Sequence, residues 1–485
     1  MVLHLNAHEL AGRKRRVQNA QDSGSGQFHE HFENDFAVFR CNRFVRYDQM
    51  FTRSFNLKYI FENAQSLQRN CAVRKMPNSL PQFTALYERH RTAQFELSQL
   101  KRTQNTLSKS IKSSEDVDKI KEEAKLLKAR IHDAQRDLDK LHENLMNMAA
   151  SVPNTTHSSV PEGEEPILVE EVGKTPEHKE WMRDHVDLAT ELELCDFNRA
   201  SKVSGSGFFY LKNMGALLEF ALVRYAIDKC IERGFTPIIS PDLIRYNVLE
   251  SCGFSPRSDD PQTYFIEPHS KSSEEQTSRD PYQLCLTATS EFPLAAMHGN
   301  EVLLKKVLPI KYVAFSHCFR AEGMAGALNR GLYRVHQFSK VEMFSLAIPS
   351  QSQNILDEFV SVQKDIFRGL GLSFRILNMP ASDLGAPAHI KYDIETFMPV
   401  RKIWGELSSA SNCTDYQSRR LNIKYHEEAK TDFVHTVNGT AIAIPRVIMA
   451  ILENNQTESG EVIVPEVLRP YLYGKERLVK PQNEK

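Results

Sequence analysis

The sequence predicts an α+β fold, in which a mainly antiparallel β-sheet with helices follows a long antiparallel α-helical coiled-coil arm. Heptad spacing of mostly apolar residues over 83–148 predicts the arm. Beyond the arm, apolar strand-like runs occur in adjacent pairs joined by turns, with few of the intervening helices that parallel strands require. The two common nucleotide-loop signatures, G-x-x-x-x-G-K-[ST] and G-x-G-x-x-G after a strand, are missing from the sequence. The pattern therefore favours an antiparallel sheet.

Length, charge and cysteine content limit the class of protein. The chain has 485 residues, enough for two or more domains, and a formal net charge of -1, so a nucleic-acid surface would have to be local. The 8 cysteines are scattered without a C-x-x-C pair, which fits a reducing compartment and argues against a zinc site or a disulfide framework. No apolar run approaches the roughly 20 residues of a membrane helix. We therefore expect a soluble protein without a membrane partner.

Residues 1–55 are predicted to be a presequence or a poorly structured extension. The basic stretch "GRKRRVQ" is followed by acidic residues, whereas organelle transit segments are rich in arginine and poor in acids. A second methionine, Met50, opens "MFTRSFNLKYIF", which is more typical of such a segment. The amino-terminal pattern therefore leaves both an organellar and a cytoplasmic location open.

Residues 56–150 are predicted to form the helical arm. Two heptad series, broken by "KSSED", predict two helices that fold back on each other. The spacing places these residues in the seam: Phe83, Leu86, His90, Ala93, Leu97, Leu100, Gln104, Leu107 and Ile111, then Val117, Ile120, Ala124, Leu127, Ile131, Ala134, Leu138, Leu141, Leu145 and Met148. Basic residues gather near the tip, among them Lys101, Arg102, Lys109, Lys112 and Lys119. The pattern alone fits either a solvated dimerisation coil or a lever that grips a polyanion.

Residues 151–175 read as a linker, because "SVPNTTHSSVPEGEEP" combines prolines with polar residues. A second domain over 176–485 follows. An apolar helix is predicted from Gly215 to Gly234, where the glycine ends it, and "FTPIISP" is predicted to be a short buried strand.

The stretch "AFSHCFRAEGMAGALNRGLYRVHQFSKVEMFSL" over 314–346 predicts a hairpin with an unusual charged face. Alternate residues of a strand share a face. One face should therefore carry Arg320, Glu322, Arg334, His336, Phe338, Lys340 and Glu342. Such a face is costly unless a ligand satisfies it. Nucleotides suit it, because guanidinium groups pair with phosphates and a phenyl ring stacks on a purine; a salt-bridge ladder on an exposed sheet is the alternative.

Three other segments supply matching chemistry. "LTATSEFPL" is expected to place Thr289 and Glu291 on one strand face, and "GELSSASN" sets Glu406 beside several serines, a combination that suits Mg²⁺ and phosphate oxygens, although a serine-rich turn is the usual explanation. "GTAIAIPR" leads from a short strand into a helix, so Arg446 should lie near a helix amino end, where anions are favoured.

These segments resemble the class II aminoacyl-tRNA synthetases. "FRAE…RGLYRVHQFSKVE" resembles their motif 2, "GTAIAIPR" their motif 3, and "GFTPIISP" their motif 1. More narrowly, "HVDLATELELCDFNRASKVSGSGFFYLKN", "GELSSASNCTDYQSRR" and the paired heptads resemble the seryl-tRNA synthetases. "ASNCTDYQSRRL" with "HTVNGTAIAIPR" is most similar to the mitochondrial and bacterial-type enzymes, which favours a mitochondrial matrix location, with the cytoplasm as the alternative. The resemblance covers about residues 56–475. It implies a class II catalytic domain that activates L-serine with ATP and transfers serine to the 3' end of tRNA(Ser).

The resemblance also implies roles for individual residues. Catalytic roles fall on Arg320, Glu406 and Arg446. ATP is expected at Arg320, Ala321, Glu322, Arg334, His336, Phe338, Glu406, Leu407, Ser408, Ser409 and Arg446. Serine is expected at Thr289, Ser290, Glu291, Arg320, Glu342, Asn438 and Thr440. Glu406 and Ser409 are the expected Mg²⁺ ligands, and tRNA(Ser) is expected at Lys101, Arg102, Lys109, Lys112 and Lys119.

Two further expectations follow from the family. Motif 1 implies a homodimer, since the helix over 215–232 is apolar on more than one face. A catalytically inactive synthetase-like paralogue that acts as an RNA-binding or scaffold protein is the alternative function. Such a paralogue should have lost its charged pocket residues, whereas Arg320, Glu322, Glu342, Glu406 and Arg446 are all present.

Overall fold

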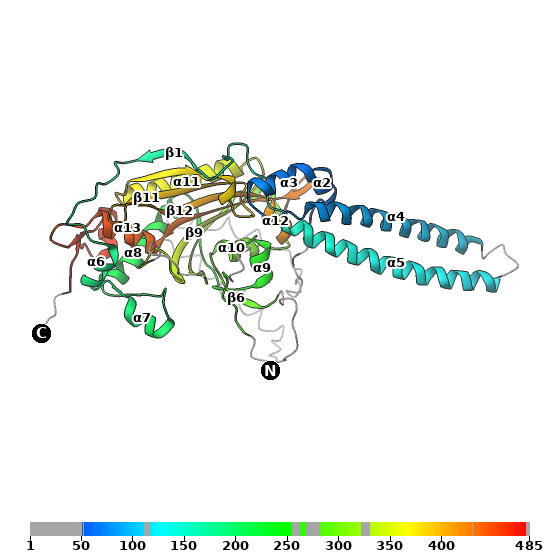
Figure 1. The fold of residues 1–485 in the computed structure, drawn as a ribbon, viewed down its shortest axis with the longest axis horizontal. Helices are drawn as coiled ribbons and strands as arrows, with labels where there is room; N and C mark the ends of the chain where they lie inside the picture. Colours follow the sequence, from blue (N-terminus) through cyan, green and yellow to red (C-terminus); the bar gives the residue numbers. More distant parts are fainter. Residues whose placement is uncertain are drawn as a thin grey trace, which may run out of the picture. The chain divides into compact units, whose positions relative to one another are not determined.

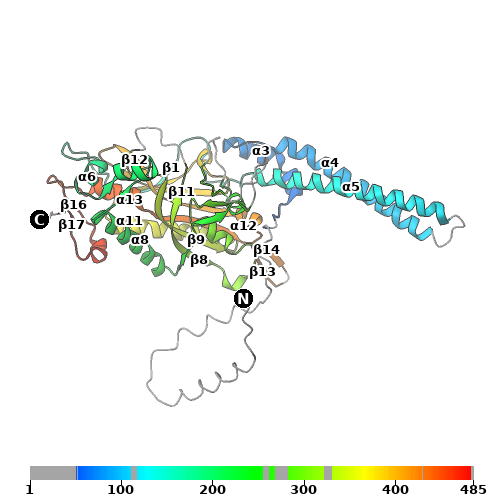
Figure 2. The same ribbon diagram turned by 90° about the horizontal axis from the view of Figure 1, so that it is seen from below.

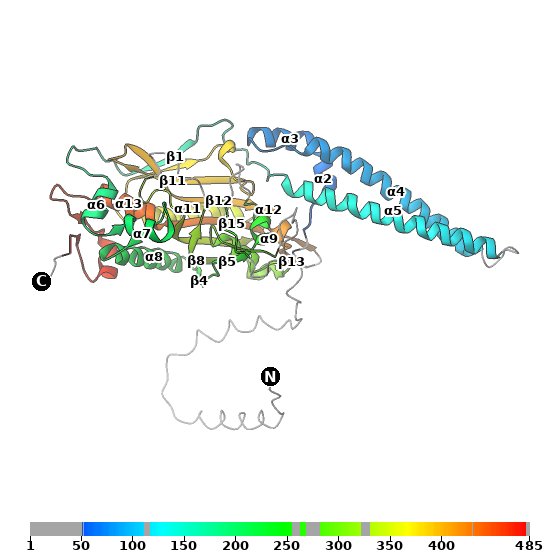
Figure 3. The ribbon, with the colours of Figure 1, turned by 60° about the horizontal axis from the view of Figure 1, so that its bottom comes forward.

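The structure, a computed structural model, describes residues 51, 53–110, 117–254, 262–267, 282–321, 330–428 and 430–481. Its first elements are the helices α2 (Leu57–Glu62), α3 (Ala64–Val73), α4 (Leu80–Ser110) and α5 (Val117–Ser151). Helices α4 and α5 lie side by side in all three ribbon views (Figure 1, Figure 2, Figure 3). The described members of the predicted seam are buried or half-buried, whereas most of their neighbours on both helices are exposed. The heptad pattern therefore marks the face along which these helices meet.

The base of the arm has a small core of its own. It consists of Ile60, Leu67, Cys71, Leu80, Phe83, Leu145, Ala149 and Val152. Next to this core, the fully buried guanidinium of Arg74 donates from Nη1 to the carbonyl of Asn154 at 2.8 Å and from Nη2 to the carbonyl of Gly385 at 2.5 Å. The amide of Asn154 in turn donates to the carbonyls of Pro387 and Cys413, both at 2.8 Å. These contacts join the arm to the second domain.

The main sheet has the strand order β1-β10-β11-β12-β15-β9-β8-β4. Its strands are β1 (Ile167–Val172), β4 (Thr236–Ile239), β8 (Ile310–Phe319), β9 (Gln337–Ala347), β10 (Phe374–Asn378), β11 (Ile390–Met398), β12 (Ile403–Thr414) and β15 (His435–Ala443). All neighbours are antiparallel except β4 and β8. The predicted antiparallel sheet and the predicted pairing of β8 with β9 are thereby confirmed.

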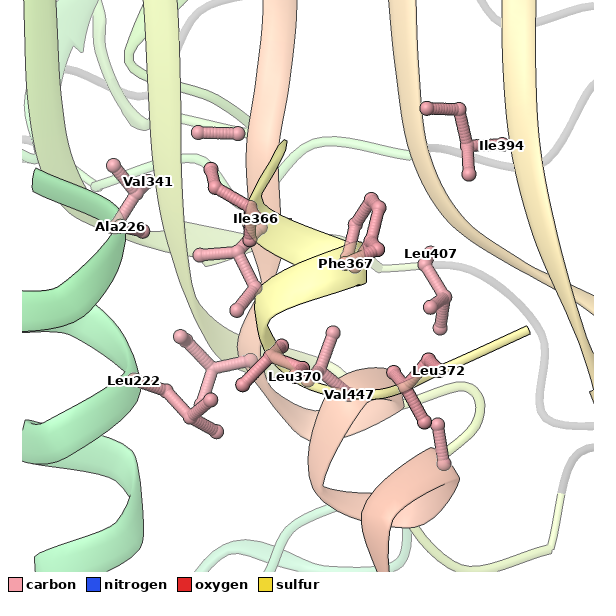
Figure 4. Packing of buried hydrophobic residues seen from close by; sticks show 14 of the residues in the cluster. Leu222, Ala226, Val341, Ile366, Phe367, Leu370, Leu372, Ile394, Leu407 and Val447 are labelled. Carbon is pink, nitrogen blue, oxygen red and sulfur yellow. The ribbon is translucent and has the colours of Figure 1, made fainter. Parts of the chain in front are cut away.

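One face of the sheet is covered by three helices: α8 (Met214–Glu232), α11 (Ser352–Gly369) and α13 (Ile444–Asn454). Their side chains and those of the sheet form the main core, part of which Figure 4 shows with Leu222, Val341, Ile366, Phe367 and Val447. Most residues of this core are aliphatic or aromatic, and the others include cysteines and methionines, residue types that are commonly buried.

The opposite face of the sheet is only partly covered. Three short helices, α9 (Tyr246–Ser251), α10 (Glu291–Ala296) and α12 (Tyr416–Leu421), contribute to a second core. This core includes Phe344 and Leu346 from the last part of β9. The first part of β9 is left open on this face, and that opening is where the cavity described below lies.

The remaining elements are short. They are α6 (His185–Glu191), β2 (Cys195–Asp196), α7 (Phe197–Ser204), β3 (Tyr210–Leu211), β5 (Leu243–Arg245), β6 (Leu284–Leu286), β7 (Val302–Leu304), η2 (Lys305–Val307), η4 (Ala381–Asp383), β13 (Lys424–Glu427), β14 (Lys430–Phe433), β16 (Val462–Ile463), η5 (Glu466–Leu472) and β17 (Arg477–Leu478). Across the described ranges, no helix is both long and apolar enough to span a bilayer.

Three expectations need correction. Part of the predicted linker 151–175 is strand β1, which pairs with β10 at the edge of the main sheet. The strand β4, predicted to be buried, is largely exposed, and the side chain of Ile239 is 94% accessible. "LTATSEFPL" is a turn leading into a helix rather than a strand, since β6 ends at Leu286 and α10 begins at Glu291. Most of the predicted extension 1–55 lies outside the described residues.

Candidate active site

A cavity of about 1040 Å³ opens on the uncovered part of the sheet. Its walls include Arg320 just after β8, the first half of β9, parts of β12 and β15, and the start of α10 and α13. Most of the predicted site residues line it: Thr289, Glu291, Arg320, Arg334, Phe338, Glu342, Glu406, Leu407, Ser408, Ser409, Asn438, Thr440 and Arg446. Segments far apart in the sequence are therefore brought to one cavity.

Strand β9 supplies alternate residues to this cavity. Phe338, Lys340 and Glu342 line it, whereas Val341 and Met343 point into the main core. The register of the hairpin pairs Lys340 with Ser316 and Glu342 with Ala314 on β8. The predicted charged strand face is therefore formed where β9 begins.

Two arginines occupy one side of the cavity. The guanidinium of Arg320 lies over the ring of Phe338, 5.4 Å from its centroid. Arg446, near the amino end of α13, donates from Nη1 to Oε2 of Glu406 at 3.2 Å and to the carbonyl of Glu406 at 2.9 Å. Its guanidinium also lies 5.0 Å from the ring centroid of Tyr333. This arrangement presents fixed positive charge next to aromatic rings.

The carboxylate of Glu406 is held in its charged form. Burial favours the protonated form, but the positive charges of Arg446 and Lys391 outweigh it and lower the pKa of Glu406. Lys391 lies on β11, where its ammonium is 2.9 Å from Oδ2 of Asp393. Burial raises the pKa of Asp393 to about 7, and the charge of Glu406 adds to that effect. An ionised Glu406 is suited to bind a cation.

The other side of the cavity holds the carboxylates of Glu291 and Glu342. We call this part of the cavity the carboxylate pocket; it also contains Thr289, Lys340, Asn438 and Thr440. Oε1 of Glu291 accepts hydrogen bonds from Gln417 at 2.5 Å and Asn438 at 2.9 Å. Oε2 of Glu342 is 2.5 Å from the ammonium of Lys340 and accepts from Thr440 Oγ1 at 3.1 Å. Burial and the charge of Glu342 raise the pKa of Glu291 to about 7.

Two regions of the chain match known family models. Residues 55–156 match the seryl-tRNA synthetase N-terminal domain, and residues 273–455 match the tRNA synthetase class II core domain (G, H, P, S and T). The serine–tRNA ligase of Treponema denticola is 38% identical over 424 residues, which cover 85% of this chain and 97% of that protein. The chain belongs to the seryl-tRNA synthetase family.

Solved structures of the family share the fold. The seryl-tRNA synthetase from Pyrococcus horikoshii complexed with ATP aligns with a TM-score of 0.81 and 34% identity, covering 88% of this chain and 100% of that one. The cytoplasmic serine-tRNA ligase from Naegleria fowleri in complex with AMP aligns with a TM-score of 0.77 and 26% identity, covering 89% and 100%. The class II core and the N-terminal helical arm predicted from the motifs are thereby confirmed.

Some residues expected at the site of this family member lie elsewhere. His336 does not line the cavity. Its ring donates from Nδ1 to the carbonyl of Arg320 at 2.8 Å and lies 5.4 Å from the ring centroid of Phe208. Strand β9 begins only at Gln337, so the alternation predicted from the sequence does not extend to residue 336. Ser290 is fully buried, and its hydroxyl accepts a hydrogen bond from Ser316.

One other expected residue lies away from the cavity, and another lines it with its side chain turned into the core. Ala321 does not line the cavity, and its N–H donates to the carbonyl of Gln262 at 3.1 Å. The side chain of Leu407 lies in the main core (Figure 4), so this residue can reach the cavity only through its main chain. Glu322 and Lys112 lie outside the described residues.

Sequence reasoning missed several residues around the cavity. Lys340 was placed on the charged face but received no role, and Gln417, Lys391 and Asp393 were not singled out. The signal for Asp393 was available, since it pairs with Ser409 across β11 and β12 and so shares its face. Gln417 reaches Glu291 from α12, 126 positions away in the sequence, and no local pattern predicts that contact.

A group of potential metal ligands lies outside the cavity. Asp184, His185 and Glu453 approach one another closely. Both ring nitrogens of His185 are engaged, because Nε2 accepts from the N–H of Leu332 at 3.3 Å and Nδ1 lies 3.2 Å from Glu453. This group therefore reads as a buried structural network that holds the chain just before β9.

Proposed function

We propose that this protein activates L-serine with ATP to give seryl-adenylate and transfers serine to the 3' end of tRNA(Ser). The observation that carries the proposal is that one cavity joins a carboxylate pocket to a face of arginines and Glu406, with Arg320 among the lining residues. An ammonium fits the first part and a triphosphate fits the second. The serine–tRNA ligase relatives and the ATP and AMP complexes of the similar structures support the same activity.

The first step needs charge neutralisation rather than a general base. The serine carboxylate is already an anion at neutral pH, so its oxygen can attack the α-phosphorus directly. The bond between the α-phosphorus and the bridging oxygen breaks, and pyrophosphate leaves. Arg320 is the residue we propose to hold both the carboxylate and the α-phosphate, because a guanidinium offers several donors in a fixed plane. Arg446 and Arg334 add positive charge, and Phe338 offers a ring for the adenine. Positioning and electrostatic stabilisation then lower the barrier.

We propose that Glu406 and Ser409 hold Mg²⁺. Both offer oxygen donors from β12 to the cavity, the ligand type that Mg²⁺ prefers. The lowered pKa of Glu406 keeps this donor charged. The bound ion would neutralise phosphate charge.

The carboxylate pocket is proposed to bind serine. Its members bind one another through the hydrogen bonds given above, which fixes their orientation before a substrate arrives. Groups committed to a hydroxyl would be left without a partner by alanine, and such a loss costs more than a missing methyl group. We therefore assign serine selectivity to Thr289, Glu291, Glu342, Asn438 and Thr440.

The arm is proposed to bind tRNA(Ser). Lys101, Arg102, Lys109 and Lys119 are exposed on α4 and α5, and Lys101 also donates to Gln135 of α5 at 3.0 Å. Lysine contacts to phosphate suit recognition by RNA shape.

We also propose that the protein forms a homodimer through α8 and β4. Phe220 on α8 is 69% exposed and Ile239 on β4 is 94% exposed, although both are large apolar side chains. An exposed apolar surface next to an edge strand is typical of a protein interface. A second copy of the chain would bury both residues.

We also propose a mitochondrial matrix location, with the cytoplasm as the alternative. The resemblance of the motifs to mitochondrial and bacterial-type enzymes supports it. Fractionation of cells, followed by mass spectrometry of the protein in the organelle fraction, tests the location and gives the mature N-terminus.

ATP–pyrophosphate exchange dependent on L-serine tests the central activity. The purified full chain should show exchange with L-serine and much less with L-alanine, and it should charge tRNA(Ser). A folded protein that binds tRNA(Ser) but gives no exchange would instead be the inactive RNA-binding paralogue.

A further inference from the structure

Lys340 is a buried cation in the carboxylate pocket. Only 6% of its surface is accessible, and it lies on β9 between Phe338 and Glu342 on the cavity face. Its ammonium is 2.5 Å from Oε2 of Glu342 and donates to Oγ1 of Thr289 at 2.8 Å. A buried lysine is rare and requires a specific partner.

The two carboxylates of the pocket differ in the side chains that donate hydrogen bonds to them. Glu342 is paired with a positive charge, and Thr440 also donates to the same oxygen, Oε2. Glu291 receives hydrogen bonds from the neutral side-chain amides of Gln417 and Asn438, both at Oε1. Within the part of the chain that the structure describes, the second oxygen of each carboxylate accepts no hydrogen bond from the protein.

We infer that Lys340 determines which carboxylate binds the substrate ammonium and which binds the hydroxyl. Its charge cancels that of Glu342, so an incoming ammonium is attracted more strongly by Glu291. Glu342, fixed and neutralised, is then left to accept a hydrogen bond from the neutral hydroxyl. This inference deepens the proposed function and rests on it. Lys340 is thus a positioning residue that acts through Glu342.

The charges of the pocket are consistent with this division. Without substrate, two carboxylates face the single cation Lys340, with Arg320 close enough to influence Glu291. Burial, followed by the charge of Glu342, raises the pKa of Glu291, and the contacts that Glu291 makes at Oε1 come from neutral amides. A serine zwitterion adds an ammonium beside Glu291 and a carboxylate beside Arg320. The ammonium then supplies a positive charge next to Glu291, whose direct hydrogen-bond donors are neutral.

A set of charge-neutralising variants tests the inference. We compare the wild type with Lys340→Met, Glu342→Gln and the double variant, and measure ATP–pyrophosphate exchange at varied L-serine, L-alanine and ATP. Lys340→Met should raise the KM for serine by roughly tenfold or more and lower the preference for serine over alanine, with the KM for ATP changed by less than about twofold. The double variant should have a lower KM for serine than the product of the two single effects predicts, because it leaves neither charge unpaired.

A matched lysine serves as the control. Lys311 on β8 is 2.8 Å from Glu358 and does not line the cavity. Lys311→Met removes a comparable ion pair, so it reports the general cost of losing a partly buried lysine. It should reduce thermal stability without changing the preference for serine over alanine.

Several outcomes would overturn the inference. Lys340 would be a purely structural residue if its loss changed the KM for serine and the KM for ATP equally. The same conclusion would follow from strictly additive effects in the double variant, or from an unchanged preference for serine in Lys340→Met. If Lys340→Met does not fold, Lys340→Arg replaces it as the test, because it keeps the charge. Lys340→Arg should retain the wild-type preference for serine over alanine, whereas the double variant should lose it. The same preference in Lys340→Arg and the double variant would contradict the inference. A wild type without serine-dependent exchange would contradict the proposed function instead.

Discussion

At the scale of single residues, Arg320 has the central place. It follows the last residue of β8, its N–H donates to the carbonyl of His336 at 2.9 Å, and its guanidinium lies over Phe338. The main-chain hydrogen bond fixes the backbone of Arg320, and the ring of Phe338 limits the positions that its guanidinium can take. The side chain is therefore positioned before ATP and serine arrive, which is the condition for electrostatic catalysis.

Arg320→Ala should abolish most of the adenylate formation. Loss of one donor that acts on the transition state typically costs on the order of 100-fold to 1000-fold in rate. ATP–pyrophosphate exchange measures the loss, and circular dichroism checks the fold. Arg477→Ala serves as the control. Arg477 donates to Glu461 at 2.6 Å and does not line the cavity, so its loss should leave exchange unchanged. Exchange near the wild-type rate in Arg320→Ala would refute the proposed role.

Glu291 should make stability depend on pH. Its pKa is about 7 in the folded protein and near 4.5 when unperturbed, so between these values the folded state holds more protons than the unfolded state. Stability from this group is therefore present below about pH 4.5 and is lost as the pH rises to about 7, a change on the order of 3 kcal/mol.

Glu291→Gln should remove that loss. The variant keeps an oxygen that accepts from Gln417 and Asn438 but carries no charge. Urea unfolding at about pH 5 and about pH 8 without substrates measures the difference, and the variant should gain stability relative to the wild type at the higher pH. Glu458→Gln, at an exposed position, is the control. Parallel pH profiles for wild type and Glu291→Gln would contradict the assignment.

At the scale of elements, the sequence predicted the hairpin of β8 and β9 because charge and apolar residues alternate along it. Phe338, Lys340 and Glu342 could therefore be placed on one face from the sequence. The contact of Gln417 with Glu291 could not, because it depends on how α12 packs against α10. The exposure of β4 was also missed. A short, mostly apolar strand is predicted to be buried whether the protein's own core or a second copy covers it.

The arm helices can be shortened without disturbing their base. The rings of His90 and His142 lie 5.5 Å apart, so residues near these positions can be joined by a short linker. Replacing residues 93–139 by a Gly-Ser linker preserves the base core that contains Phe83 and Leu145. We expect serine-dependent exchange to stay within about twofold of wild type and tRNA(Ser) charging to fall by about 100-fold or more, as loss of several phosphate contacts implies.

A charge-only version separates the surface from the length of the arm. Lys109→Gln combined with Lys119→Gln should weaken charging and reduce its dependence on salt, because fewer counterions are released on binding. Lys174→Gln combined with Lys179→Gln, on exposed lysines outside the arm, is the control. Undiminished charging by the shortened arm would show that α4 and α5 do not contact the substrate RNA.

At the scale of the whole molecule, the proposed dimer can be tested at β4. Ile239→Asp places a charge where an apolar side chain is 94% exposed in the single chain. If a second copy covers this position, the buried charge should dissociate the dimer, because an unpaired charge is strongly unfavourable in an interface. Sedimentation velocity measures the change from dimer to monomer. Val479→Asp, at a position 45% exposed and away from β4, should leave the assembly unaffected.

One face of β9 lines the cavity and the other packs in the main core, so insertions and deletions in this strand are restricted. Deleting a single codon between Gln337 and Lys340 would rotate the following residues by half a turn, so that Val341 and Met343 would face the cavity and Glu342 would enter the aliphatic interior. An insertion or deletion of two codons would keep the faces but displace Glu342 along the strand by about 7 Å. Length changes in this strand should therefore be absent from functional descendants, whereas conservative replacements of Val341 should persist.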